Sequence, residues 1–497
     1  MISRRTTAVL AATGLLALAA CGSSKKDAPA TTAAPAVTTA APATTVAPAA
    51  TTAAPAATTA KPAATTAAPA ATTAAPAATT AAAGGSYKTD PIWGGVAEST
   101  TGGKCGAGDG KKATGAPVKI GAISTMIPGI DFKDGPNAEA AYFKCVNDNG
   151  GVHGRPIELI NVNDELDPAK AGAAAAKLID SEKVVAIAGG FSIIDCPVNG
   201  RTYAAKGFNI IVAGVPAECF GQPNIAATNM GPHYSAQGAA QAVLRDGAKG
   251  KIVHVTGNNP GADYNGTGVK TLAEAAGLQF EDVQVALPIK DGNTLVADLV
   301  KKAGKGGGIV ITFTPPEALT IMKAAEDQNL IDEVIWGSAT PANDASVAKA
   351  LSAKWDGKMR INAELAPLDT NGPDMKLIKE VLAKYDSKTP LGSFAQMGFM
   401  IGQLVVDTLN KMPAADIDSA VKVNAAIKGI KNYKTDILCR PWYYGDGSSH
   451  VPNNWDLTVV PKGGVLVVKD KCFEITAVDD ILKGVRAFEA ANNVNKG

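Results

Sequence analysis

The sequence has almost no net charge, few histidines and none of the common hydrolase motifs. Its 497 residues carry a formal net charge of +1, from 47 basic and 46 acidic side chains. A nucleic-acid-binding protein usually has a basic excess or a basic face, so no nucleic-acid partner is expected. The four histidines are scattered, and neither His-Glu-x-x-His nor Gly-x-Ser-x-Gly occurs. We therefore predict no catalytic residue, no metal and no cofactor.

The first twenty residues have the pattern of a signal peptide. Two arginines near the start precede an apolar run over residues 8–18, which is too short to span a bilayer as a mature helix. The run ends in Leu18-Ala19-Ala20-Cys21-Gly22. This resembles a bacterial lipobox, whose cysteine is diacylated and becomes the new N-terminus. It implies that Cys21 anchors the chain to the outer face of the cytoplasmic membrane. A plain signal with a chance cysteine is the alternative, and both the general and the twin-arginine export routes stay open.

Residues 21–86 repeat variants of Thr-Thr-Ala-Ala-Pro-Ala. They show no apolar periodicity, so they cannot bury enough surface to offset the entropy of ordering. Frequent proline favours extended conformations. We predict a disordered stalk, with threonine and proline content that suits O-glycosylation.

After a pre-domain segment over residues 87–117, the pattern alternates between strands and helices. Apolar runs at 118–123, 157–162, 184–188 and 209–213 alternate with helical patterns, and Asp167 is the expected N-cap of the helix that Pro168 opens. The alternation resumes from 251 to 328. It predicts an α/β fold of parallel sheets flanked by helices, too long for one core and so split into two lobes. Open sheets of this kind bind ligands beyond the carboxyl ends of their strands.

Several stretches together resemble a known family. They are Val118-Lys119-Ile120-Gly121, the segment Asn147–Ile157 (NDNGGVHGRPI), Asn163–Ala171 (NDELDPAKA), Asp263-Tyr264-Asn265-Gly266 and Pro316-Glu317-Ala318. Their order and spacing resemble the leucine/isoleucine/valine-binding group of periplasmic type I solute-binding proteins, over Val118 to Val468. The resemblance implies two Rossmann-like lobes with parallel sheets, joined by three crossovers near Met230, Ala363 and Pro441.

On this basis the first lobe takes residues 118–230 and 363–441, and the second takes 231–362 and 442–497. The resemblance further implies an extracytoplasmic monomer that captures a small polar metabolite between its lobes. An ATP-binding-cassette (ABC) permease would be its partner. A ligand-sensing receptor and an envelope hydrolase on an α/β scaffold are the alternatives.

The resemblance also implies which residues contact the ligand. The nine positions are Phe132, Ser192, Ile193, Val215, Ala217, Tyr264, Thr314, Ala339 and Phe394. Structural roles stay open for several of them, such as a turn at Ser192, a helix start at Tyr264, or core packing at Phe394.

One of these positions departs from the family pattern. An amino-acid binder has a carboxylate near Ala339, and an unpaired buried ammonium costs several kcal/mol. Asp344 and Glu317 are the candidate substitutes, and an amide or a carboxylate is an equally good ligand.

Six cysteines remain once Cys21 is lipidated, enough for three disulfides among fifteen possible pairings. We favour Cys196–Cys219 within one βα unit, Cys439–Cys472 between the last crossover and the C-terminal segment, and Cys105–Cys145 between the pre-domain segment and the first helix. No Cys-x-x-Cys is present, so a zinc site is not indicated.

Overall fold

The computed structural model of the chain describes residues 87–445 and 450–494. All of them belong to one structural unit, residues 78–497. The signal segment 1–20 and the whole repeat region 21–86, including Cys21, lie outside the described residues. Within the described part, none of the helices combines the length and the apolarity that a membrane span requires.

The first of two large sheets contains five parallel strands in the order β4-β1-β5-β6-β7. Its strands are short apolar runs because helices cover both faces, as is typical of parallel sheets. Their bounds are β1 Val118–Ser124, β4 Ile157–Asn163, β5 Ala186–Gly190, β6 Ile210–Val212 and β7 Ile225–Ala227. This sheet and its helices form the first lobe.

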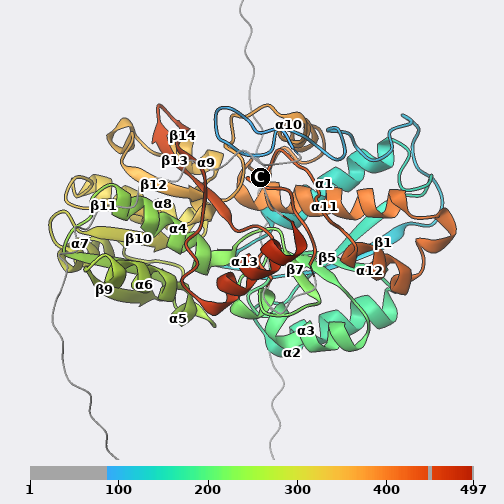
Figure 1. Cartoon of the computed structure of the whole chain (residues 1–497), viewed down its shortest axis with the longest axis horizontal. Helices are drawn as coiled ribbons and strands as arrows, with labels where there is room; N and C mark the ends of the chain where they lie inside the picture. The colour runs from blue at the N-terminus through green and yellow to red at the C-terminus, as the bar shows by residue number, and fades with distance from the viewer. Residues whose placement is uncertain (1–86, 446–449, 495–497) are drawn as a thin grey trace, which may run out of the picture. The chain divides into compact units, whose positions relative to one another are not determined.

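The helices of the first lobe come from two distant parts of the chain. They are α1 Asp134–Asp148, α2 Pro168–Ala176, α3 Asp195–Ala205, α10 Pro373–Tyr385, α11 Ser393–Lys411 and α12 Ala420–Lys428. Helices α1 and α11 lie side by side (Figure 1). Asp167 caps α2 by accepting hydrogen bonds from the N–H groups of Ala169 at 2.8 Å and Lys170 at 3.3 Å. The predicted N-cap is therefore confirmed.

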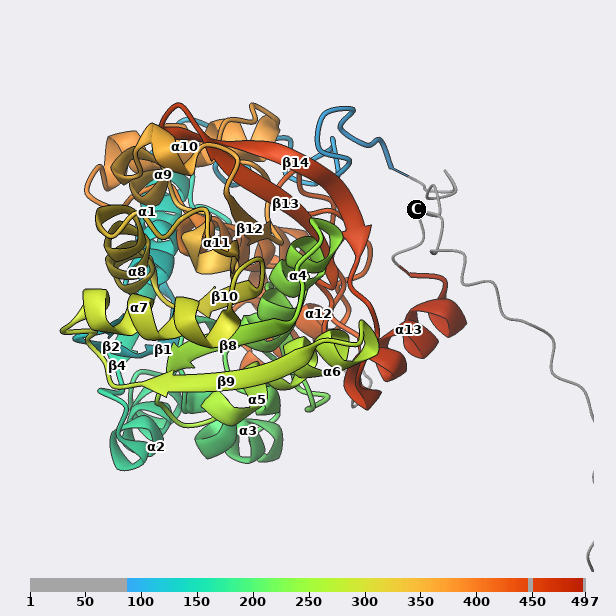
Figure 2. The same cartoon turned by 90° about the vertical axis from the view of Figure 1, so that its left-hand side faces the viewer.

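The second sheet has seven strands in the order β14-β13-β12-β11-β10-β8-β9. Five are parallel, and β13 and β14 add an antiparallel pair at one edge, visible in Figure 2. The strands are β8 Lys251–Gly257, β9 Gln279–Val285, β10 Gly308–Thr312, β11 Ile335–Ser338, β12 Met359–Ala363, β13 Trp455–Lys462 and β14 Val465–Glu474. The α-helices of this second lobe are α4 Gly231–Arg245, α5 Ala262–Asn265, α6 Thr267–Ala275, α7 Gly292–Ala303, α8 Pro315–Asp327 and α9 Ala345–Ala350.

The structure also contains a small hairpin and several short helices. The hairpin joins β2 Met126–Ile127 to β3 Ile130–Asp131. One π-helical segment, Lys177–Ser181, continues α2. The 3-10 helices are Ala217–Cys219, Thr340–Ala342, Ala353–Trp355 and Ala414–Asp416.

Three passages of the chain join the lobes. The first runs from β7 to α4, and the second leaves β12 at Ala363. The third was expected near Pro441, but the chain beyond it still contacts the first lobe. The indole N–H of Trp442 donates to the Ala227 carbonyl at 2.9 Å, and the N–H of His450 donates to the Phe220 carbonyl at 2.8 Å. The chain enters the second sheet only at β13.

The C-terminal helix α13, Asp480–Asn492, contacts both lobes. Its Leu482 and Val485 pack in the same core cluster as strand residues of the first sheet. Its N-cap, Asp479, accepts a hydrogen bond from the Tyr234 hydroxyl of α4 at 2.9 Å. Figure 1 shows α13 between α4 and β7. The tail that we assigned to the second lobe thus spans the junction.

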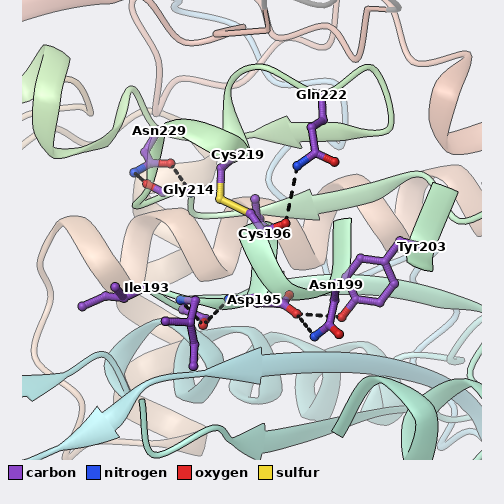
Figure 3. Close-up of a disulfide and its surroundings, with 12 residues drawn as sticks. Ile193, Asp195, Cys196, Asn199, Tyr203, Gly214, Cys219, Gln222 and Asn229 are labelled. Atoms are coloured by element: carbon purple, nitrogen blue, oxygen red, sulfur yellow. Dashed lines mark hydrogen bonds between the residues drawn. A yellow bond between two sulfur atoms is a disulfide. The ribbon is translucent and has the colours of Figure 1, made fainter. Parts of the chain in front are cut away.

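The structure contains three disulfides, and they join the pairs that we favoured: Cys105–Cys145, Cys196–Cys219 and Cys439–Cys472. Figure 3 shows that Cys196–Cys219 ties the first turn of α3 to the segment after β6. The pre-domain segment is also held against the rest of the fold. Trp93 is buried, and its carbonyl accepts the N–H of Cys472 at 2.8 Å.

Candidate functional site

A cavity lies between the lobes, at the carboxyl ends of strands from both sheets. On the first-lobe side, Ile193 follows β5 and Val215 follows β6. On the second-lobe side, Thr256 lies near the end of β8, Thr312 ends β10, and Thr340 follows β11. The chain reverses direction beyond each strand, so these loops converge where open α/β sheets bind ligands. The cavity has a volume of about 100 Å³.

The tips of the lobes meet over this cavity. Gly129, in the turn between β2 and β3, has φ of 85°, which favours glycine. A Cβ at this position would lie 2.9 Å from the Cβ of Leu287 and 3.1 Å from the nitrogen of Pro288, both in the second lobe. The hydroxyl of Thr314 lies 3.5 Å from the Gly129 carbonyl. The two lobes are therefore closed on one another, and this closure needs a residue without a side chain.

The walls of the cavity are mainly apolar. The larger apolar side chains that line it are Ile130, Phe132, Ile193, Val215, Leu287, Phe313, Phe394 and Met397. The rings of Phe132 and Phe394 meet edge to face with centroids 5.4 Å apart, and Phe191 packs on Phe394 from behind at 6.2 Å. Such contacts fix the ring orientations, so these walls are shaped before a ligand arrives.

The cavity also contains a buried glutamate. Glu364 follows β12 directly, is 1% exposed, and its carboxyl accepts a hydrogen bond from the N–H of Met230. Burial raises the pKa of Glu364 to about 8, against the opposing effect of hydrogen bonds from Met230 and Thr340. The group is therefore largely neutral at pH 7 in the structure as it stands.

Five of the nine predicted positions line the cavity: Phe132, Ile193, Val215, Thr314 and Phe394. They come from four separate loops and from α11, so the fold brings together residues far apart in the sequence. Their contact with a ligand stays a prediction.

Three other positions lie close to the cavity but outside its lining. Ser192 is buried, donates a hydrogen bond to Asp164, and accepts the N–H groups of Ile194 at 3.0 Å and Asp195 at 2.9 Å. These bonds hold the turn that precedes α3. Ala217 begins a 3-10 helix, and Ala339 is fully buried between β11 and Thr340.

Tyr264 lies away from the cavity, contrary to our expectation. Its ring stacks on His233 with centroids 4.0 Å apart, and its hydroxyl lies 3.4 Å from both Tyr234 and Asp479. The one-turn helix α5 turns this side chain toward the C-terminal tail, while Asn265 of the same helix lines the cavity. Tyr264 is not among the residues that line the cavity and is not part of the proposed site.

The two carboxylates considered as substitutes at Ala339 have other partners. Asp344 caps α9 by accepting the N–H of Ser346 at 2.7 Å. Glu317 accepts the N–H of Ile289 at 2.9 Å. Neither lines the cavity. Sequence reasoning missed Glu364, although a single acidic residue within the apolar run 361–366, directly after a predicted crossover, was a usable signal.

Among residues 87–445 and 450–494, no group of three or more His, Cys, Asp or Glu side chains is placed to hold a metal ion.

Comparison with known proteins agrees with this architecture. A model of the periplasmic binding protein family matches residues 117–464. A branched-chain amino acid ABC transporter protein from Thermus thermophilus with bound valine is 16% identical, with a TM-score of 0.64 over 75% of this chain and 99% of that one. A fatty acid ABC transporter substrate-binding protein from Thermomonospora curvata is 22% identical, with a TM-score of 0.61 over 75% and 95%.

A solute-binding protein of an ABC transporter from R. palustris, in complex with benzoate, is 19% identical. Its TM-score is 0.59 over 74% of this chain and 99% of that one. At these identities the likeness concerns the fold. No match was found among curated protein sequences.

The family match covers more than half of the chain, including the first sheet, all of the second sheet except β14, and all three passages. The family and these structural neighbours are non-enzymatic solute-binding proteins, and the family implies an extracytoplasmic location. The hydrolase alternative is therefore set aside. The chain belongs to the periplasmic binding protein family.

Proposed function

We propose that this chain is a lipid-anchored solute-binding protein that captures a small molecule between its lobes and delivers it to an ABC permease. The supporting observation is the cavity itself, which is built from the carboxyl ends of strands in both sheets and closed by the contact of Gly129 with Leu287. Residues from both lobes surround a ligand there, so its binding favours the closed arrangement over the open one.

The binding step is tested on the purified mature chain. A library of small solutes is screened by thermal shift, and native mass spectrometry identifies any molecule that co-purifies. A ligand at 100 times its dissociation constant adds about 2.7 kcal/mol to the free energy of unfolding. Failure of every solute to bind, with the protein folded, would contradict the proposal.

The anchor is tested separately in cells. We expect the wild-type chain to sediment with the membrane fraction and Cys21→Ala to lose its lipid and leave that fraction. A match of the mature mass to an unmodified N-terminus would exclude lipidation.

Delivery is tested by uptake of the identified ligand into cells with and without the chain. Loss of uptake, restored by the wild type and not by a Phe394→Ala variant that no longer binds, supports import. Unchanged uptake with a changed signalling response would favour the receptor alternative.

A further inference from the structure

We propose that Glu364 pairs with a positively charged amine on an otherwise apolar ligand, and that the cavity has no cationic side chain to pair with a ligand carboxylate. This inference deepens the proposed function and rests on it. It names the chemical class of solute that the cavity accepts.

The first observation that supports this inference is the charge of the side chains that line the cavity. Among the described residues around the cavity, Glu364 is the one ionisable side chain, and no lysine, arginine or histidine lines it. An anion in this apolar space would have no countercharge and would lie beside a carboxyl group. An ammonium would meet a carboxylate partner.

Helix N-termini are the usual alternative for binding an anion, because their first N–H groups are unpaired. Here proline removes several of those groups from the helices that begin beside the cavity. α8 begins with Pro315 and Pro316, and Pro232 stands at the second position of α4. The N–H of Asp195, the first residue of α3, donates to Ser192, and the N–H of Met230, which precedes α4, donates to Glu364.

Several other polar groups of the lining are already hydrogen-bonded. The N–H of Thr340 donates to the Ser235 hydroxyl, which in turn lies 2.8 Å from the Thr340 hydroxyl. The side-chain amide of Asn229 binds both backbone groups of Gly214, at 2.7 and 2.8 Å. A ligand carboxylate that used these groups would have to break these bonds, whereas an amine adds to the carboxyl that is already in place.

Glu364 is also held rigidly. Its carboxyl binds the N–H of Met230, and its backbone carbonyl accepts the amide of Asn453 at 3.2 Å. The carboxyl is largely protonated at pH 7 when no ligand is bound, because burial raises its pKa to about 8. When an alkylammonium ion binds, the carboxyl loses its proton to solvent and the two charges pair. Binding therefore releases up to one proton at pH 7.

The test uses three probes with the same branched carbon skeleton: 3-methylbutylamine, 3-methylbutan-1-ol and 3-methylbutanoate. Isothermal titration of the full mature chain at pH 7, in buffers of different ionisation enthalpy, gives affinity and proton release together. We expect the amine to bind at least tenfold more tightly than the other two, with proton release that the alcohol does not show.

Glu364→Gln should abolish the preference for the amine and the proton release, while its amide oxygen still accepts the N–H of Met230. Glu317→Gln is the matched control, since Glu317 is a buried glutamate that accepts a backbone N–H outside the cavity. It should leave both measurements unchanged. Should Glu364→Gln fail to fold, Thr340→Val still reports. The Thr340 hydroxyl lowers the pKa of Glu364, so its loss should shift the pH dependence of proton release by the amine to higher pH.

Three results would overturn the inference and leave the proposed function standing. They are tighter binding of 3-methylbutanoate than of the amine, an amine preference that survives Glu364→Gln, and a more than tenfold gain for leucine over the amine. The last would show that a carboxylate is recognised. If no solute binds at all, the proposed function itself fails.

Discussion

The carboxyl group of Glu364 accepts a hydrogen bond from the backbone N–H of Met230, 134 residues earlier in the chain. Met230 ends the first passage between the lobes, and Glu364 begins the second. Asn453 of the third passage donates to the carbonyls of Thr228 at 3.1 Å and Glu364 at 3.2 Å. One cavity residue, which itself lies in the second passage, is thus bonded to the other two.

The stability of the ligand-free protein should depend on the ionisation of Glu364. Burial raises its pKa from 4.5 to about 8, so between these values the folded chain retains a proton that the unfolded chain releases. Stability therefore falls as pH rises through this window. Glu364→Gln has no such proton. We expect its free energy of unfolding, relative to wild type, to increase by roughly 2 to 4 kcal/mol between pH 5 and 8.5.

Urea denaturation at several pH values measures this difference. Asp456 is also buried and its pKa is likewise raised, with the charge of Glu364 as one cause, so the wild-type curve contains both groups. Taking the difference between variant and wild type isolates the part that depends on Glu364. A difference that stays flat with pH would contradict the prediction.

Gly129→Ala should weaken ligand binding by preventing full closure. The added Cβ would lie 2.9 Å from Leu287 and 3.1 Å from Pro288. Gly115→Ala is the control, because Gly115 has a similar φ of 92° but no atom within 4 Å of an added Cβ. Both variants have about 1 to 2 kcal/mol of backbone strain. Only Gly129→Ala should lose affinity and show a larger radius of gyration by X-ray scattering with ligand present.

Replacing Cys196 and Cys219 by serine should cost about 3 kcal/mol of stability, because the bridge closes a loop of 23 residues. The loops that carry Ile193 and Val215 flank this bridge (Figure 3), so affinity should fall as well. The Cys105/Cys145 double serine variant should lose similar stability, and neither cysteine lines the cavity. Equal losses of affinity in both variants would argue against a local effect.

Tyr264→Ala and Phe394→Ala should separate stability from binding. Tyr264 packs on His233 beside the tail, so its removal should cost roughly 2 kcal/mol and leave the dissociation constant within twofold. Phe394 lines the cavity, so its removal should weaken binding tenfold or more. Calorimetry with the identified ligand measures the second effect and thermal unfolding the first. Strong loss of affinity in Tyr264→Ala would return that residue to the site.

Features that depend only on residues close together in the sequence were predicted correctly. Apolar runs located β1, β8 and β10 to within a residue, since a strand buried on both faces is largely apolar. The edge strand β4, which is half-buried, was located equally well from its alternation of apolar and polar residues. Asp167 was recognisable as a cap because the residue type and the following proline act within one turn. The disulfide pairs followed from the order of the elements.

Apolar patterning and local motifs were enough to predict the class of fold, its division into two lobes and the loops that meet between them. Which side chains of those loops face the cavity depends on contacts between segments far apart in the chain. Tyr264 turns toward a tail helix more than 200 residues later, and Glu364 is placed by a hydrogen bond to Met230. The direction of a side chain in a loop or a one-turn helix depends on packing against distant segments, which no local pattern encodes.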